Sequence, residues 1–215
     1  QEINSIINEQ FNLKVHTKRP LSGYSNENTL LSTSESNQYV LKEYTDKTME
    51  LDWLEEESRI INILSEKYPG QFPGPIPTKD GNFTGISRSK TGVKKIRIFE
   101  YLEGSFFTNQ NPTQQLIESF GTFLAKMDLE LWKIKSLPIE ARISDWDIQH
   151  LYQFEIRSEF IEDTQIKKLT DHFTLQFKET VLPVLPQLRK SLIHGDANDG
   201  NVLVNNKKVT GIIDF

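Results

Sequence analysis

The sequence predicts an α+β protein with a strand-rich N-terminal lobe over residues 1–103 and a mainly helical C-terminal lobe over residues 104–215. Short apolar runs separated by turn-forming residues fill most of the first lobe, which is typical of antiparallel strands. Apolar residues at helical spacing dominate from residue 112 to residue 182. With 215 residues the chain is long enough to bury a substantial core in one large domain or in two lobes.

The composition is that of an ordinary soluble globular protein, with 36% hydrophobic and 26% charged residues. A net charge of −5 argues against nucleic acid as the main partner, because binding to the phosphate backbone requires a basic face. No apolar run is long enough to span a bilayer, and no secretory segment is recognisable. The absence of cysteine excludes disulfides, zinc–thiolate sites and a thiol nucleophile, and is compatible with a cytoplasmic location. The oligomeric state stays open.

Each element of the N-terminal lobe has a local signal. Four apolar residues at helical spacing predict a short helix over residues 3–11, and a longer apolar stripe predicts a second helix over residues 48–67. Alternating runs bounded by turn residues predict strands at residues 14–20, 27–33, 38–44, 82–87 and 93–102.

The C-terminal lobe is expected to contain three helices before its final segment. The first would begin with Asn111 as N-cap and Pro112 at the first helical position, and would run to Trp132. Residues 144–147 are expected to cap a second helix, and residues 163–182 to form the third.

The final segment consists of three short apolar runs with polar residues at the breaks. Asp196 follows the first run, Asn201 opens the second, and Asp214 ends the third. Asn205 and Asn206 predict a tight turn between the last two runs, so that these strands would form a hairpin. Two acids and an amide delivered to one small volume suit a hard cation such as Mg²⁺. The alternative is a hairpin whose Asp and Asn residues merely cap turns.

Two upstream residues have positions that suggest a role. Alternation along the strand at 38–44 places Lys42 on the same face as the apolar Val40. Glu57 lies in the middle of the apolar stripe of the helix at 48–67, and a carboxylate on a buried face is costly unless it is paired. The alternatives are a solvated strand lysine and a glutamate at the edge of the stripe with its head group in water.

The final segment also carries a resemblance. Asp-x-x-x-x-Asn followed by an apolar strand ending in Asp is similar to the catalytic segment shared by protein kinases and small-molecule kinases. The His-Gly-Asp at 194–196 and the Ile-Ile-Asp-Phe at 212–215 resemble the aminoglycoside phosphotransferase/choline kinase family. Within that family, the surroundings most resemble the hydroxylysine-kinase-like phosphotransferases, including those fused to aminotransferases. The resemblance covers about residues 13–215 and implies a bilobal protein-kinase-like fold.

The resemblance implies a role for each of these residues in phosphoryl transfer. Asp196 would accept a proton from the attacking substrate hydroxyl or orient it. Asn201 and Asp214 would hold Mg²⁺ against the phosphates of ATP. Lys42, paired with Glu57, would contact the α/β side of the nucleotide. His194 is expected to brace the loop and not to take part in the chemistry.

Less specific signals complete the expected nucleotide site. The break between the first two strands has one glycine and not a full glycine-rich pattern, and Ser25 and Asn26 within it would help to hold phosphate. A plain surface hairpin is the alternative. The backbone near Glu100 and Leu102 resembles the segment between the lobes where these kinases bind adenine.

The expected function is an ATP- and Mg²⁺-dependent transfer of phosphate to a hydroxyl of a small, amine-bearing molecule. Asp145 and Asp147 flank Trp146, and carboxylates beside an aromatic ring would attract an ammonium group. An ordinary Asp N-cap beside a core tryptophan is the alternative. A protein-kinase-like regulator and a non-catalytic nucleotide-binding module of a larger fused enzyme also stay open. Because a helical segment follows in the family, we expect further residues after Phe215.

Overall fold

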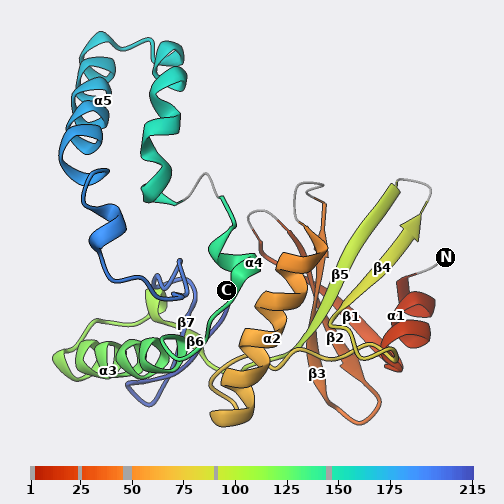
Figure 1. The fold of residues 1–215 in the computed structure, drawn as a ribbon. Coiled ribbons are helices and arrows are strands. Elements are labelled where there is room, and N and C mark those ends of the chain that lie inside the picture. Colours follow the sequence, from red (N-terminus) through yellow and green to blue (C-terminus); the bar gives the residue numbers. More distant parts are fainter. Residues whose placement is uncertain (1–2, 24–25, 46–49, 90–91, 144–146) are drawn as a thin grey trace. The chain divides into compact units, whose positions relative to one another are not determined.

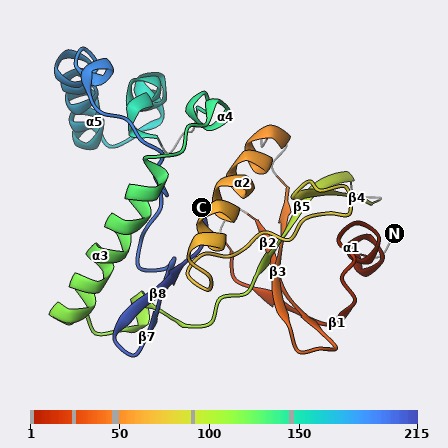
Figure 2. The same ribbon diagram turned by 60° about the horizontal axis from the view of Figure 1, so that its bottom comes forward.

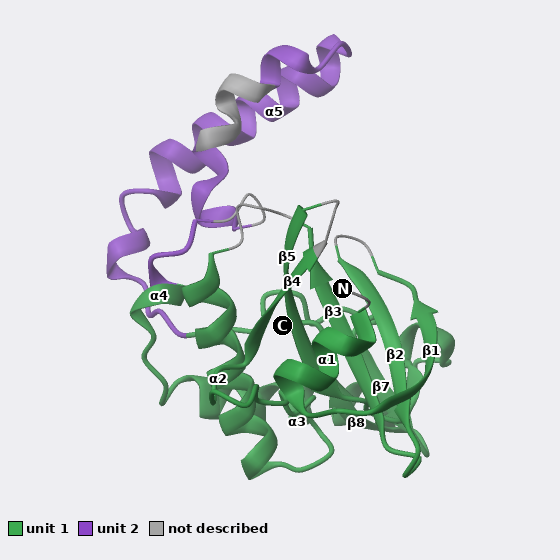
Figure 3. Ribbon diagram, turned by 90° about the vertical axis from the view of Figure 1, so that its right-hand side faces the viewer, with its two compact units in different colours: residues 1–139, 192–215 green, residues 140–191 purple. Residues whose placement is uncertain are grey.

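The computed structural model describes residues 3–23, 26–45, 50–89, 92–143 and 147–215, with the backbone alone at 89 and 153–157. The chain divides into two compact units, one made of residues 1–139 and 192–215 and the other of residues 140–191 (Figure 3). This division follows packing within the chain. The lobe boundary expected between residues 103 and 104 stays a prediction.

The first unit is built on a five-stranded antiparallel sheet (Figure 1). Its strands lie in the spatial order β1-β2-β3-β5-β4, so that β3 and β5 are central neighbours. The bounds are β1 Val15–Leu21, β2 Glu27–Thr33, β3 Gln38–Tyr44, β4 Thr84–Ser89 and β5 Gly92–Glu100. All five strands predicted from alternation are therefore present, with ends that differ by at most two residues.

Helices cover both faces of this sheet (Figure 1 and Figure 2). Helix α1, Ile3–Phe11, buries three apolar side chains against Leu31, Leu41, Ile96 and Ile98. Helix α2, Leu51–Lys67, covers the face that carries Lys42. Strand side chains alternate between the two faces. The face toward α1 is apolar where the helix packs and carries the Lys94 ion pairs with Glu27 and Glu43 farther along the strands, whereas the face toward α2 buries Arg97.

Gln10 of α1 also completes the hydrogen bonding of edge strand β4. Its side-chain Nε2 donates to the Ile86 carbonyl at 2.7 Å, and its Oε1 accepts from the Ile86 amide at 2.9 Å. The amide group thus takes the place of a neighbouring strand, which protects an otherwise open sheet edge.

A second, three-stranded sheet carries the C-terminal segment. Strand β7, Val202–Asn205, lies between β6, Ser105–Phe106, and β8, Lys208–Ile212. The predicted tight turn between β7 and β8 is present one residue later than expected, because Asn205 is still part of β7. Its two residues, Asn206 and Lys207, have φ values of 49° and 62°, as in the left-handed turns that match strand twist.

The core of this region joins α2, the β7–β8 hairpin and helix α3, Gln114–Leu131. Its buried members are Ile60, Leu64, Phe72, Phe123, Met127, Leu131, Val202 and Ile212. The predicted start of α3 is wrong. The N-cap is Thr113 and not Asn111, and its hydroxyl accepts a hydrogen bond from the Leu116 amide at 3.2 Å. Two short elements flank α3, namely η1 Phe107–Asn109 and α4 Leu137–Glu140.

The second unit is helical, as predicted. It contains η2 Ile148–Phe160, α5 Thr164–Gln176, the π-helical η3 Phe177–Val181 and η4 Leu185–Gln187. Asp163 caps α5 by accepting from the amides of Gln165 and Ile166. Of the apolar residues that predicted this helix, Phe177 is buried, whereas Ile166, Leu169 and Phe173 are each more than half exposed. Within the described residues, no helix combines the length and the apolar character needed to cross a membrane.

The predicted fold class is confirmed, because an antiparallel sheet with covering helices precedes a mainly helical region.

The shared core predicts a sharp contrast between two neighbouring residues of α2. Leu64 has no exposed surface, whereas Ile63 is 37% exposed. We expect Leu64→Ala to lower the free energy of unfolding by about 2–5 kcal/mol, because it leaves a cavity. Ile63→Ala is the matched control and should lower it much less. Urea unfolding of both variants measures the difference, and equal losses would contradict the assignment of the core.

Candidate active site

The loop before β7 is organised around the Asp196 carboxylate. Asn198 Nδ2 donates to one carboxylate oxygen at 2.8 Å, and Asn201 Nδ2 donates to the other at 2.9 Å. Asn201 Nδ2 is also 2.9 Å from the Asp196 carbonyl oxygen, and Gly200 N donates to Asn198 Oδ1 at 2.8 Å. The side chain of Asp196 is therefore held in a fixed orientation while the residue itself stays exposed.

The buried His194 side chain links this loop to the end of β8 through two hydrogen bonds. The Asp196 amide donates to its Nδ1 at 3.2 Å, so the proton of the neutral imidazole lies on Nε2. Nε2 then donates to the Ile213 carbonyl at 3.0 Å, and the ring packs 4.3 Å from that of Phe215. Burial lowers the pKa of His194 below its ordinary value, although the Ile213 carbonyl and the Asp196 and Asp214 carboxylates act in the opposite direction.

Asp214 is brought to the same place by the end of β8. The Ile213 amide donates to the Asn201 carbonyl at 2.9 Å, which ties the residue before Asp214 to the loop after Asp196. Asp214 itself has a φ of 68°, a left-handed conformation that is uncommon outside glycine. Its carboxylate forms an ion pair with Lys42 of β3. The structure therefore gathers four of the predicted residues, Asp196, Asn201, Asp214 and Lys42.

The donor chemistry of this cluster fits Mg²⁺. Asn201 uses its Nδ2 to bind Asp196, which leaves its Oδ1 on the other side of the amide group. The Asp214 side chain is 54% exposed, so its oxygens are accessible. Among the described residues, no three His, Cys, Asp or Glu side chains are grouped to hold a metal ion. A cation held by Asn201 and Asp214 would thus complete its shell with water and phosphate oxygens, as Mg²⁺ usually does.

Glu57 lies where the sequence predicted it, on the face of α2 that meets the sheet, but its ionic partner is a residue that the sequence reasoning missed. The prediction was a pair with Lys42. Instead, Arg97 Nη2 of β5 lies 2.7 Å from Glu57 Oε1, and Lys42 pairs with Asp214. The missed signal is an arginine within the apolar run Ile96–Phe99, on the face that alternation assigns to Phe99.

The end of β5 is held by backbone contacts. The Glu100 amide donates to the Gly74 carbonyl at 2.8 Å, and the Tyr101 amide donates to the Gln38 carbonyl at 3.2 Å. Leu102 is buried and packs closely against Gly211 of β8. A Cβ added to Gly211 would lie only 3.2 Å from Leu102 Cδ1. This segment is therefore fixed against both sheets of the first unit.

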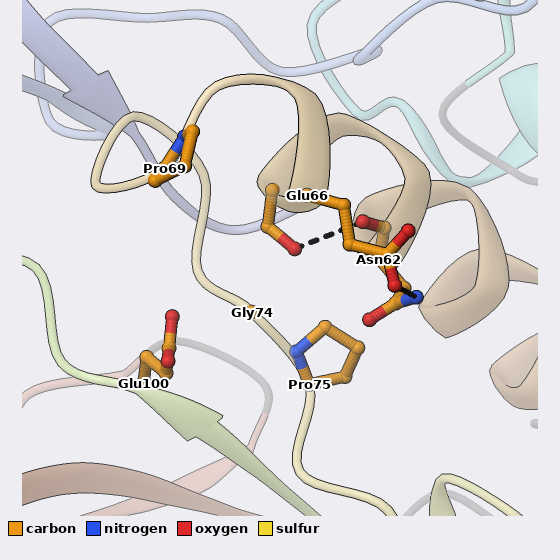
Figure 4. Close-up of a pocket in the computed structure, with 7 residues that line it drawn as sticks. Asn62, Glu66, Pro69, Gly74, Pro75 and Glu100 are labelled. Atoms are coloured by element: carbon orange, nitrogen blue, oxygen red, sulfur yellow. Dashed lines mark hydrogen bonds between the residues drawn. The ribbon is translucent and has the colours of Figure 1, made fainter.

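The Glu100 side chain faces a polar pocket of about 260 Å³ beside α2 (Figure 4). The lining residues are Asn62, Ser65, Glu66, Pro69, Gly74, Pro75 and Glu100. None of the residues gathered around Asp196 lines it. A Cβ at Gly74 would lie 2.6 Å from Glu100 Oε2, so the exposed Glu100 side chain would have to move to accommodate it.

The other predicted site residues are less informative. Asn26 immediately precedes β2, whereas Ser25 lies outside the described residues. Asp145 and Trp146 also lie outside them. Asp147 is described, and its carboxylate caps η2 by accepting from the Gln149 amide at 2.9 Å. Its position is thus the one expected of an N-cap, and a role toward substrate stays a prediction.

The burial of His194 predicts how stability depends on pH. The folded protein binds a proton at His194 more weakly than the unfolded chain, whose ordinary histidine pKa is 6.5. The free energy of unfolding should therefore fall as the pH drops below about 6.5 and level off once the pH is below the folded pKa. Urea unfolding at pH 7.5 and pH 5.5 measures this difference. His194→Gln keeps a donor for the Ile213 carbonyl and should reduce the difference; an unchanged pH dependence in that variant would contradict the assignment.

Comparisons with known proteins show the family of this chain. The model of the phosphotransferase enzyme family (APH) matches residues 16–215. A hydroxylysine kinase of Danio rerio is 22% identical over 228 residues, which cover all of this chain and 64% of that protein. The chain thus spans less than two thirds of the length of this relative.

Solved structures share the fold. An amicoumacin kinase in complex with AMP-PNP, Ca²⁺ and Ami has a TM-score of 0.72 at 18% identity, over 99% of this chain and 62% of that one. A microcompartment-associated aminopropanol kinase has a TM-score of 0.68 at 17% identity, over 99% of this chain and 67% of that one. Because the family model matches nearly the whole chain, the chain belongs to the phosphotransferase enzyme family (APH).

Proposed function

We propose that the protein transfers the γ-phosphate of ATP, with Mg²⁺, to a hydroxyl of a small, amine-bearing molecule. The observation that carries this proposal is the convergence of Asp196, Asn201, Asp214 and Lys42 from three separated segments of the chain. Phosphoryl transfer requires of a protein mainly positioning and charge stabilisation, and this cluster supplies both.

Asp196 would take the proton of the attacking hydroxyl. As the hydroxyl oxygen forms its bond to the γ-phosphorus, the bond to the ADP leaving group breaks and the proton passes to the carboxylate. The hydrogen bonds from Asn198 and Asn201 hold this carboxylate in one orientation, so little reorganisation is required during the reaction.

The phosphates would lie between Lys42 and the oxygens of Asn201 and Asp214. Mg²⁺ held by those oxygens would neutralise charge on the phosphates. Lys42 pairs with Asp214, and the Asp214 side chain is 54% exposed, so its carboxylate would reach the phosphates through the cation. The carbonyl of Glu100 and the amide of Leu102 would bind adenine, since the Glu100 amide is already used by Gly74. Ser25 and Asn26 would lie over the phosphates.

The substrate class rests on the named relatives. One relative is called a hydroxylysine kinase and one structural neighbour an aminopropanol kinase, and both names describe amino alcohols. Asp147, with Asp145 and Trp146, would attract the ammonium group. A cytoplasmic location remains a prediction.

If Asp196 is the general base, the Asp196→Ala variant should lose turnover and still bind nucleotide. We expect the rate of ADP formation to fall by about 10²–10⁴-fold, because a general base typically contributes that much. The affinity for Mg-AMP-PNP should change little, since the carboxylate acts on the hydroxyl. Asp199→Ala is the matched control, because Asp199 is an exposed aspartate of the same loop.

The assay measures ADP release from Mg-ATP with hydroxylysine, 1-amino-2-propanol and an aminoglycoside as acceptors. Normal turnover in the Asp196 variant would refute its role as the base. Nucleotide binding by the unaltered protein without ADP release on any acceptor would favour a non-catalytic nucleotide-binding module.

A further inference from the structure

Arg97 is the largest charged side chain that the described structure buries, with 2% of its surface exposed. It lies in the centre of β5 and is the direct cross-strand partner of Lys42 in β3. Directly opposite residues of an antiparallel pair project from the same face of the sheet. A second cation therefore lies immediately beside the lysine proposed to bind phosphate.

The guanidinium group of Arg97 is fully engaged by its surroundings. Nη2 donates to Glu57 Oε1 at 2.7 Å, and Nε donates to the Tyr44 hydroxyl at 2.8 Å. Nη1 donates to Ser58 Oγ at 3.0 Å and to the Leu54 carbonyl at 3.2 Å. Three of these four partners belong to α2, so Arg97 fixes the helix to the sheet.

One aromatic ring lies near both cations. The Arg97 guanidinium lies 4.8 Å from the ring centroid of Tyr44 and 5.0 Å from that of Phe99. The Lys42 ammonium lies 6.0 Å from the same Phe99 ring. The Phe99 ring is thus within cation–π distance of both cations.

Lys42, Arg97 and Glu57 together carry a net charge of +1; Lys95 lies on the same face of β5, and Asp214 pairs with Lys42. We infer that Arg97 is a positioning residue of the nucleotide site: it neutralises Glu57, which leaves the charge of Lys42 for Asp214 and the nucleotide. This inference rests on the proposed function. Its physical basis is that a buried carboxylate without a counter-charge would oppose binding of a polyanion.

The summed charge of Lys42, Arg97 and Glu57 predicts how each variant should bind Mg-AMP-PNP. Arg97→Met lowers the sum to zero and should weaken binding of Mg-AMP-PNP roughly tenfold, because the partly buried charges are poorly screened. Glu57→Gln in the same background restores the sum to +1 and should restore the affinity. Arg97→Lys keeps the sum and should bind nearly normally. Glu57→Gln alone raises the sum and should not weaken binding.

If Arg97 had a purely structural role, the Arg97→Met/Glu57→Gln double variant would bind Mg-AMP-PNP as weakly as Arg97→Met or more weakly. Removing a second member of the hydrogen-bond network would not restore the structure. Arg59→Met is the matched control: Arg59 pairs with Glu56 at 2.7 Å on the same helix, with 45% of its side chain exposed. That variant should bind Mg-AMP-PNP as tightly as the unaltered protein.

Titration of the nucleotide should be accompanied by urea unfolding of the same variants. A double-mutant cycle in stability should give a clear coupling between Arg97 and Glu57 and little between Lys42 and Glu57. The inference is overturned if Glu57→Gln alone weakens binding, if it fails to restore the Arg97→Met variant, or if Lys42 and Glu57 are the coupled pair. Failure of the unaltered protein to bind Mg-AMP-PNP would count against the proposed function instead, because the stability cycle needs no nucleotide.

Discussion

A guanidinium group with almost no access to water lies between helix α2 and the five-stranded sheet, and the arrangement of the first unit depends on how it is paired. Arg97 cannot be buried without partners, since the cost of removing a cation from water exceeds any gain from packing. Glu57, Tyr44, Ser58 and a backbone carbonyl of α2 supply them. These contacts fix the position of α2 along the sheet and the face that it turns toward β3 and β5.

This arrangement decides what Lys42 can do. In the kinase pattern, the strand lysine and the helix glutamate form a pair. Here the glutamate is bound by Arg97, and the lysine pairs with Asp214 at the end of β8. The contact joins the five-stranded sheet to the β7–β8 hairpin through two residues that are 172 positions apart. The contact to the helix glutamate, which the kinase pattern assigns to the strand lysine, is thus made by Arg97 here.

The C-terminal segment is organised by a different kind of interaction, which is local and depends on hydrogen bonds. Asp196, Asn198 and Asn201 lie within six consecutive residues, and their side chains satisfy one another. His194 connects this loop to the end of β8, where Phe215 covers the imidazole ring.

The sequence by itself determined the elements and the local part of the site. Strand alternation, helix periodicity and turn residues predicted all five strands of the large sheet, the β7–β8 turn and the grouping of Asp196, Asn201 and Asp214, because each signal lies within about twenty residues. The N-cap of α3 was misplaced by two residues because Asn111 and Thr113 are both good caps. Tertiary structure alone decided the pairing of the charges. Arg97 lies opposite Lys42 only through the register of β3 with β5, and Glu57 meets it only through the docking of α2. A buried charge takes the partner that lies nearest in space, and that distance is set by strand register and helix docking, not by a pattern within one segment.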